Sequence, residues 1–424
     1  MRIEYILFGI CLVLIFWLIP KISFIRNTNL TIAETRLLLF IKILSGIVCA
    51  FYFETMSTNV DYLANNEEGK LQYDLLLANP KLFFTDFTSD INNYGLGGLF
   101  ESKDSFWAYI RFNLLYKFIA ILNLVTLGNF YLNTALFCSI VFLGHIAFYR
   151  IYSEIYKGHK LKILFACFCL PSLLLYTSCV HKDGIIFICL GLISYILYNL
   201  LKSRAVFNLK HILFFILSLL TIFLFRNYVI VAMVPAMITV MLCKLMPYKK
   251  RVIVLITYSF FSLVFFLSAF SKSSFNLPVA VVNRKMDFAT LVRGNTDIQM
   301  NELQPTFQSF MVNLPQAINH SLFRPYLWEF SQLSVLLTAL EIFFYQLLIL
   351  LFIFFRKKKN ESIHHFNLFG LALLLNMMLI IGYTIPNIGA IVRYRSIFWV
   401  FLICPLLCNI DWKRLLKWRM VHGS

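Results

Sequence analysis

The sequence has little charge, few acidic residues and no polar stretch long enough to form a separate soluble domain. Charged residues make up only 14% of the 424 residues, and Asp and Glu together number 20. Hydrophobic residues make up 60%, and the mean hydropathy is +0.77, which is far more apolar than soluble domains are. This composition excludes an ordinary soluble protein and predicts a single membrane domain over residues 1–424.

The motifs of several function classes are also missing. The sequence contains no Walker A loop, no dinucleotide-binding glycine pattern, no HExxH helix and no nucleophile elbow. Its 10 cysteines fall almost entirely inside apolar runs, without the spacing of a metal site. The net charge of +18 is divided among short clusters rather than one basic face. We therefore expect no nucleic-acid partner and no resident cofactor.

Apolar runs long enough to cross a bilayer follow one another along most of the chain. Because a span needs about 20 such residues, the sequence predicts an all-α integral membrane protein, a polytopic helical bundle of about 11 spans, with a range of roughly 10–12. The first run has no cleavage motif and is interpreted as a retained span. The predicted spans are residues 4–20, 36–55, 131–149, 163–180, 184–201, 211–225, 227–245, 252–270, 332–355, 366–384 and 395–410.

The connections between these runs alternate between basic and less basic, which predicts the topology. The basic set faces the cytoplasm by the positive-inside rule. Two long loops, 56–130 and 271–331, then lie outside, and apolar residues at helical spacing predict juxtamembrane helices in both. This topology requires residues 110–128 to be re-entrant or interfacial, since a full span there would move Asp61 to the inside.

Charged residues at the ends of apolar runs are the first candidate site residues. Asp61 directly follows a span, where it would act as a general base or simply begin the next helix. Lys182 and Asp183 lie in a tight polar turn beside His181, either as a local ion pair or as a phosphate contact and a proton acceptor. Arg226 interrupts an apolar run and needs an anionic partner, for which a lipid pyrophosphate or Asp61 would serve.

The second long loop ends in a segment that mixes charged and aromatic residues. Arg324 and Glu329 would line a substrate groove, whereas Tyr326 and Trp328 are interpreted as ordinary anchors at the membrane interface.

The last outer turn carries Arg393 and Arg395, which runs against the positive-inside bias and therefore suggests a ligand. Together these segments predict an outward cluster of cations with a few available bases. The predicted bases are Asp61, Asp183 and His320, and the predicted phosphate-binding or substrate-binding residues are Lys182, Arg226, Arg324, Glu329, Arg393 and Arg395.

In this layout the chain resembles the bacterial O-antigen and capsule repeat-unit polymerases and the related multi-span glycosyltransferases of the GT-C class. The residues that carry the resemblance are Asp61, Pro171 with Ser172, Lys182 with Asp183, Arg226, the stretch from Arg324 to Glu329, and Arg393 to Arg395. The sequence departs from the pattern in two respects. A paired-acid motif is missing from the first long loop, which leaves metal dependence open, and His320 alone represents the histidine-containing loop of ligase relatives.

The resemblance implies transfer of a saccharide from a polyprenyl phosphate or pyrophosphate carrier to a growing glycan, at the outer face of the bacterial inner membrane. Membrane lipids and other polysaccharide-assembly proteins would be its partners. A single-sugar transferase would use the same groups. A flippase or transporter would bind the same carrier without making a bond, although such proteins usually have internal repeats, which this sequence lacks. A structural role in an envelope complex would leave the cations unexplained.

Overall fold

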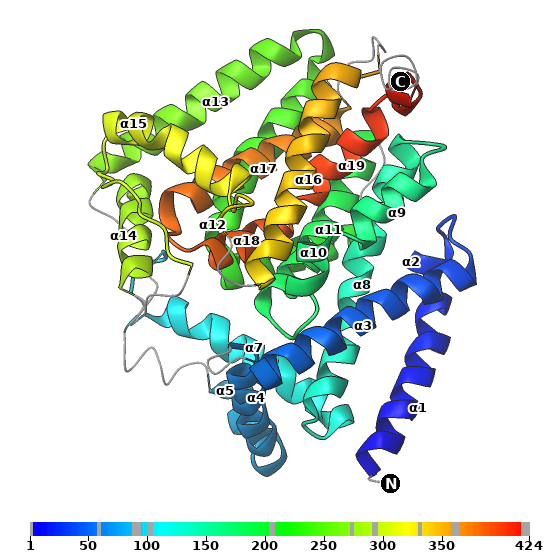
Figure 1. Cartoon of the computed structure of the whole chain (residues 1–424). Coiled ribbons are helices and arrows are strands. Elements are labelled where there is room, and N and C mark those ends of the chain that lie inside the picture. The colour runs from blue at the N-terminus through cyan, green and yellow to red at the C-terminus, as the bar shows by residue number, and fades with distance from the viewer. Residues whose placement is uncertain are drawn as a thin grey trace. The chain divides into compact units, whose positions relative to one another are not determined.

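The protein is described from a computed structural model whose regular elements are helices (Figure 1). The structure describes residues 3–56, 61–86, 95, 97–100, 105–202, 208–271, 275–290, 296–329, 333–357 and 364–416. Two isolated β-bridges are the only strand-like pairing among these residues. The chain divides into two compact units, each assembled from separate stretches of sequence.

Unit 1 comprises residues 1–150, 173–196 and 206–227. Two of its close helix packings depend on glycine. A Cβ on Gly69 would lie 2.3 Å from the side chain of Ile119, and one on Gly191 would lie 3.0 Å from the carbonyl oxygen of Gly144. Small residues allow such close packing of membrane helices. The elements wholly within this unit are α1 (Ile3–Leu18), η1 (Ile19–Lys21), α2 (Ser23–Arg26), α3 (Ile32–Met56), α4 (Asp61–Ala78), α5 (Pro80–Thr85) and α7 (Phe106–Thr126).

Unit 2 comprises residues 151–172, 197–205 and 228–424. In this unit α17 packs against α14, α15 and α19, and α16 packs against α19 (Figure 1). Its own elements are α9 (Lys160–Phe168), η2 (Pro247–Lys249), α13 (Lys250–Leu267), η3 (Ser268–Phe270), α14 (Leu277–Ala289), α15 (Phe307–Ile318), the π-helix η4 (Asn319–Phe323), α16 (Leu333–Phe355), α17 (His365–Thr384), α18 (Ile388–Ser396) and α19 (Val400–Asn409). Four helices contribute residues to both units: α8 (Phe130–Ile155), α10 (Pro171–Tyr176), α11 (Lys182–Lys202) and α12 (Leu209–Leu245).

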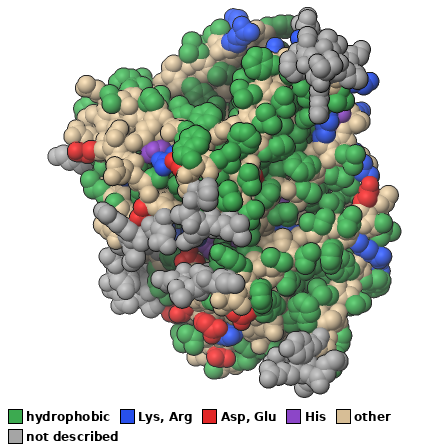
Figure 2. Space-filling view, viewed as in Figure 1, with side chains coloured by type: hydrophobic (Ala, Val, Ile, Leu, Met, Phe, Trp, Pro, Cys, Tyr) green, Lys and Arg blue, Asp and Glu red, His purple; other side chains and the backbone are tan. Residues whose placement is uncertain are grey.

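Eight of the described helices are long and apolar enough to cross a membrane, and the bent pair α18 and α19 would make a ninth span. Figure 2 shows apolar side chains spread over a large part of the visible face, as lipid-exposed helices require. The helices therefore indicate a multi-pass membrane protein of the all-α class. Both units contain candidate spans. Whether they form the single predicted membrane domain stays a prediction.

The predicted count of about 11 spans is not confirmed, and the differences have local causes. The first helix has only 16 residues, about 24 Å at 1.5 Å per residue, which is short for a bilayer core of about 30 Å. The predicted span 163–180 is divided into α9 and α10 just before Pro171, because the residue before a proline disfavours the helical conformation. The predicted span 395–410 falls on α18 and α19, which are bent by 68°.

The two predicted spans around Arg226 lie on the two parts of α12, which are separate helices joined across a kink. α12 has 37 residues in all. Its backbone leaves the helical conformation at Arg226, with φ −152° and ψ 77°. The break therefore falls at the residue where the sequence places a polar interruption.

Helices occupy both predicted long loops. The first contains α4, α5 and α7, and the second contains α14, α15 and η4. Within α7, residues 109–126 meet the length and hydropathy criteria for a span. The predicted re-entrant placement of this segment is therefore not confirmed, and the side of the membrane on which Asp61 lies stays a prediction.

Candidate functional site

The first group of buried charges lies in unit 1 and is called here the Asp183 cluster: His181, Asp183 and Arg226. The Asp183 carboxylate is fully buried in the first turn of α11 and forms an ion pair with the Arg226 guanidinium. Its second oxygen lies 2.9 Å from Nδ1 of His181. A buried charge is costly unless it is paired, and this cluster supplies the anionic partner that the sequence requires for Arg226.

Asp183 is held in place by close packing as well as by charge. The next residue, Gly184, lies so close to α8 that a Cβ there would be 2.5 Å from the ring of Phe137. Lys182, by contrast, is partly buried and places its ammonium group 4.9 Å from the ring centre of Phe112, a cation–π contact. Asp183 is therefore paired with Arg226 and His181.

Asp61 begins the helix α4, whereas the ion pair of Arg226 is with Asp183. Asp61 is an exposed residue in the first turn of α4, where its negative charge is favourable next to the positive end of the helix dipole. The following residue, Tyr62, is buried and packs its ring 5.3 Å from that of His181. The start of α4 is therefore in contact with the Asp183 cluster through Tyr62.

The second group lies in unit 2 and is called here the His320 cluster: His320, Ser321, Arg324, Glu329 and Arg395. It begins where α15 changes into the π-helix η4, and π-helical turns occur frequently at functional sites. His320 is 4% exposed, and its Nδ1 has no hydrogen-bond partner among the described residues. Burial, and next the positive charge of Arg324, lower the pKa of His320 to about 4. Its imidazole is therefore neutral at physiological pH and can accept a proton.

The cluster contains two guanidinium groups that are held differently. Arg324 forms a bidentate pair with Glu329, with N–O distances of 2.7 and 3.1 Å. Arg395 in α18 is completely buried and donates to the backbone carbonyl of Ser321 at 2.5 Å. Arg393, in the same helix, is partly buried beside the Tyr394 ring, at 5.5 Å.

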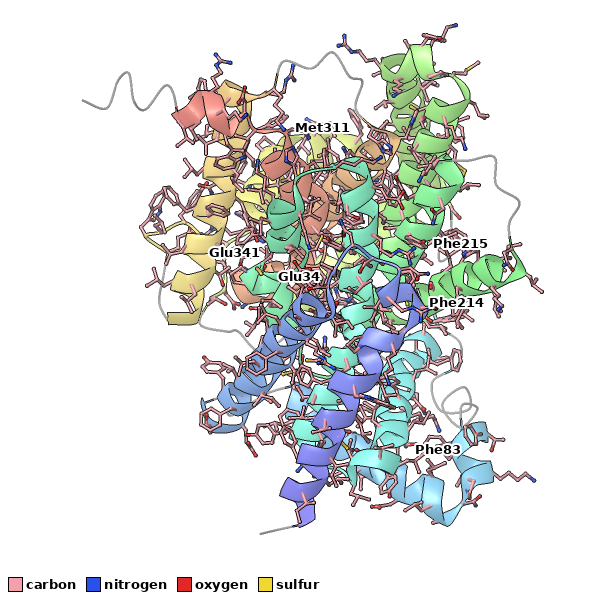
Figure 3. All side chains as sticks on the ribbon, turned by 90° about the vertical axis from the view of Figure 1, so that its right-hand side faces the viewer. Glu34, Phe83, Phe214, Phe215, Met311 and Glu341 are labelled. Carbon is pink, nitrogen blue, oxygen red and sulfur yellow. The ribbon has the colours of Figure 1, made fainter. Side chains whose placement is uncertain are left out.

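The sequence interpretation missed Glu341, a buried carboxylate on α16 that is labelled in Figure 3. Its two oxygens lie 3.2 and 3.0 Å from the backbone nitrogen of Ser172, whose hydroxyl also donates to it at 2.9 Å. The Tyr345 hydroxyl donates to the same carboxylate, and Arg395 interacts with it electrostatically. A single acidic residue inside an apolar run was the signal that could have identified it.

A second residue that was missed is Lys42, in the middle of α3 in unit 1. Its ammonium group is buried and donates to the hydroxyls of Thr177 at 2.7 Å and Ser178 at 3.0 Å, and to the carbonyl of Leu174 at 3.3 Å. These three oxygens use the three donors of the ammonium group. The lysine therefore fixes α3 to the segment that leads into the Asp183 cluster.

The predicted site residues thus fall into two groups. Asp183 and Arg226 meet in unit 1, which also contains Asp61 and Lys182, and the other five belong to or adjoin the His320 cluster in unit 2. In the part of the chain that the structure describes, no three His, Cys, Asp or Glu side chains are arranged to hold a metal ion.

Comparison with known proteins identifies no relative: no protein-family model, no curated protein and no solved structure gives a significant match to the chain.

Proposed function

We propose that this protein transfers a saccharide from a polyprenyl phosphate or pyrophosphate carrier to a hydroxyl of an acceptor glycan, with the His320 cluster as the reaction centre. The single observation that carries the proposal is a buried histidine next to Arg324, with Arg395 bound to the adjacent Ser321. An uncharged imidazole can accept a proton, and an anionic phosphate bound beside it would raise its pKa towards the range that a general base needs.

The chemistry assigns one step to each group. His320 takes the proton from the acceptor hydroxyl while that oxygen bonds to the anomeric carbon of the donor sugar. The bond from this carbon to the carrier phosphate breaks, and the phosphate leaves with the electron pair. Arg395, fixed by Ser321, and the neighbouring Arg393 stabilise the charge that grows on the phosphate. Such preorganised charges are often the largest contribution to catalysis.

In this proposal the Asp183 cluster does not supply the base. Asp183 is already committed to Arg226 and His181, so His320 is the better candidate for the base. The predicted catalytic role of Asp61, at the exposed start of α4, stays a prediction that an Asp61→Asn variant would test.

Among saccharide transferases we favour a repeat-unit polymerase acting at the outer face of a bacterial inner membrane. This choice rests on the layout of charged residues that resembles those enzymes. A single-sugar transferase would use the same groups and differ in its acceptor.

A transporter of the same lipid-linked saccharide is the second candidate, and the break in α12 at Arg226 favours it. Helices interrupted at a charged residue are typical of transporter binding sites. The ion pair between Arg226 and Asp183 argues against a substrate anion at this position, because the carboxylate already neutralises the guanidinium. We therefore place the transferase first.

The proposal is tested with the full chain in lipid nanodiscs and a radiolabelled polyprenyl-pyrophosphate saccharide extracted from the host. Wild type should convert it to longer glycans on a gel. His320→Gln should reduce the rate about 10²- to 10⁴-fold, the usual contribution of a general base. The matched control is His211→Gln, because His211 is an exposed histidine in the first turn of α12.

Three results would count against the proposal. If His320→Gln retains the wild-type rate, the base is another residue. Equal losses in the His320 and His211 variants would point to general damage. If wild type makes no product but moves the labelled lipid across a proteoliposome membrane, the transporter replaces the transferase.

A further inference from the structure

Next to the His320 cluster, two aromatic rings form an exposed stack. The rings of Tyr326 and Trp328 lie nearly parallel, at 8°, with their centres 4.7 Å apart. Trp328 is 77% exposed. A membrane-interface anchor needs no such partner, since a single amphipathic ring is enough for that role. The stacking therefore calls for a further explanation.

Hydrogen bonds hold this stack in one orientation. The Tyr326 hydroxyl donates to the side-chain oxygen of Asn319 at 2.5 Å, and the Tyr326 backbone nitrogen donates to Glu329 at 2.9 Å. With both ends of Tyr326 fixed, the ring beneath Trp328 has little freedom to move. A ligand that binds to a preformed surface loses less conformational entropy than one that must order the surface first.

The polar groups at the edge of the stack carry almost no net charge. The guanidinium of Arg324 is matched by the carboxylate of Glu329 in a bidentate pair that is 19% and 18% exposed. Because Glu329 would repel an anion, this edge is unsuited to a phosphate group. An apolar lipid chain would leave the exposed donors and acceptors of the pair without partners, which is unfavourable.

A sugar ring fits both parts of this surface. The C–H bonds on one face of a pyranose ring are attracted to the electron-rich face of an indole. Its hydroxyl groups both donate and accept hydrogen bonds, as a neighbouring guanidinium and carboxylate require. Sites that combine an aromatic wall with a few fixed polar groups are typical of small-molecule binding.

We infer that Tyr326 and Trp328 form a saccharide-binding platform that holds a pyranose ring of the acceptor glycan beside His320, an inference that rests on the proposed function. The platform is joined to the base by the chain itself. Asn319, which fixes Tyr326, immediately precedes His320, and the charge of Arg324 acts on the His320 imidazole. Arg324 and Glu329 then contact sugar hydroxyls, and the phosphate of the carrier lies with Arg393 and Arg395.

The test is a binding measurement on the full chain in nanodiscs, separate from transfer. The ligand used is the free saccharide released by mild acid from the host's polyprenyl-linked saccharide, and its dissociation constant is measured by saturation-transfer NMR. Trp328→Ala should raise the constant about 3- to 10-fold, the range expected for one aromatic contact. Trp328→Phe, which keeps a stacking face, should stay within about 3-fold of wild type.

Trp17→Ala is the matched control, because Trp17 is a 52% exposed tryptophan on α1 in the other unit. It should leave the dissociation constant unchanged. If Trp328→Ala binds the saccharide as wild type does, or if wild type binds none, the platform is refuted and Trp328 is an interface anchor.

The two proposals fail in different ways. Normal binding by Trp328→Ala with loss of transfer in His320→Gln would refute the platform and leave the transferase in place. Binding that depends on Trp328, in a wild type that makes no glycan, would refute the transferase and leave the platform.

Discussion

Gly382 of α17 lies against the backbone of α15 so closely that alanine cannot fit. A Cβ on Gly382 would be 2.0 Å from the carbonyl oxygen of Ala317 and 2.6 Å from its carbonyl carbon. Because these are backbone atoms, no side-chain rotation relieves the clash. The oxygen must retreat by about 1 Å to reach the 3.0 Å limit of real Cβ contacts, which means that part of α15 has to move.

The expected cost follows from two opposing effects. Overpacking a filled core usually costs about 1–3 kcal/mol, and a contact with rigid backbone belongs at the upper end. Alanine is favoured over glycine in a helix by up to about 1 kcal/mol, which offsets part of the loss. We expect Gly382→Ala to destabilise the protein by about 2 kcal/mol.

The displacement should also reach the His320 cluster. The carbonyl oxygen of Ala317 accepts a hydrogen bond from the Ser321 hydroxyl at 2.8 Å, and the carbonyl of Ser321 accepts from Arg395. A shift at Ala317 therefore disturbs the residue that fixes Arg395. Gly382→Ala should lower saccharide transfer as well as stability.

The measurement is the thermal unfolding midpoint in detergent, followed by transfer activity well below that midpoint. Gly9→Ala in α1 is the control, because a Cβ there would have no atom within 4 Å. The reasoning is refuted if Gly382→Ala unfolds at the same temperature as Gly9→Ala, since the close packing of α15 and α17 would then be incorrect.

Two further predictions concern the buried charges. Asp183→Asn should cost about 3–5 kcal/mol, because it leaves the buried Arg226 guanidinium without its carboxylate. The double variant with Arg226→Gln should lose less than the sum of the single variants, and additive losses in unfolding midpoint would contradict the ion pair. The second prediction follows from the pKa of His320, which is lowered from 6.5 to about 4. The unfolded chain binds the proton first, so stability should fall as the pH decreases from 6.5 to 4; His320→Gln should lose this slope, whereas His211→Gln should keep it.

The helical class could be predicted from the sequence because apolar composition and length decide it. Residues 184–201, 252–270 and 366–384 were each predicted as spans, and each lies almost entirely within one helical element or two adjoining ones. The breaks were harder to predict. Hydropathy averages over a window, so it does not register that Pro171 divides an apolar run. The kink at Arg226, by contrast, falls between two predicted spans.

The residue types of the candidate site could be predicted from the sequence, but which residues pair with each other could not. Charges in apolar runs drew attention to Asp183 and Arg226, yet nothing in the sequence joins two residues so far apart in the chain. Glu341 and Lys42 carried the same signal and were missed, because each lies inside a span rather than at its end. Asp61 was predicted because it lies at the end of an apolar run, and its charge is exposed at the start of α4.

The pairing of the arginines decides which of them can bind substrate anions. Arg226 and Arg324 each face a carboxylate, Asp183 and Glu329 respectively. Their charge is therefore largely cancelled where they lie, and a phosphate would have to compete with a fixed anion. Arg395 donates to the neutral carbonyl of Ser321 and interacts electrostatically with the buried Glu341 carboxylate, which also accepts hydrogen bonds from Ser172 and Tyr345. Because these neutral donors share the charge of Glu341, we expect the phosphate of a lipid carrier on the α18 side of the His320 cluster and a sugar on the Arg324 side.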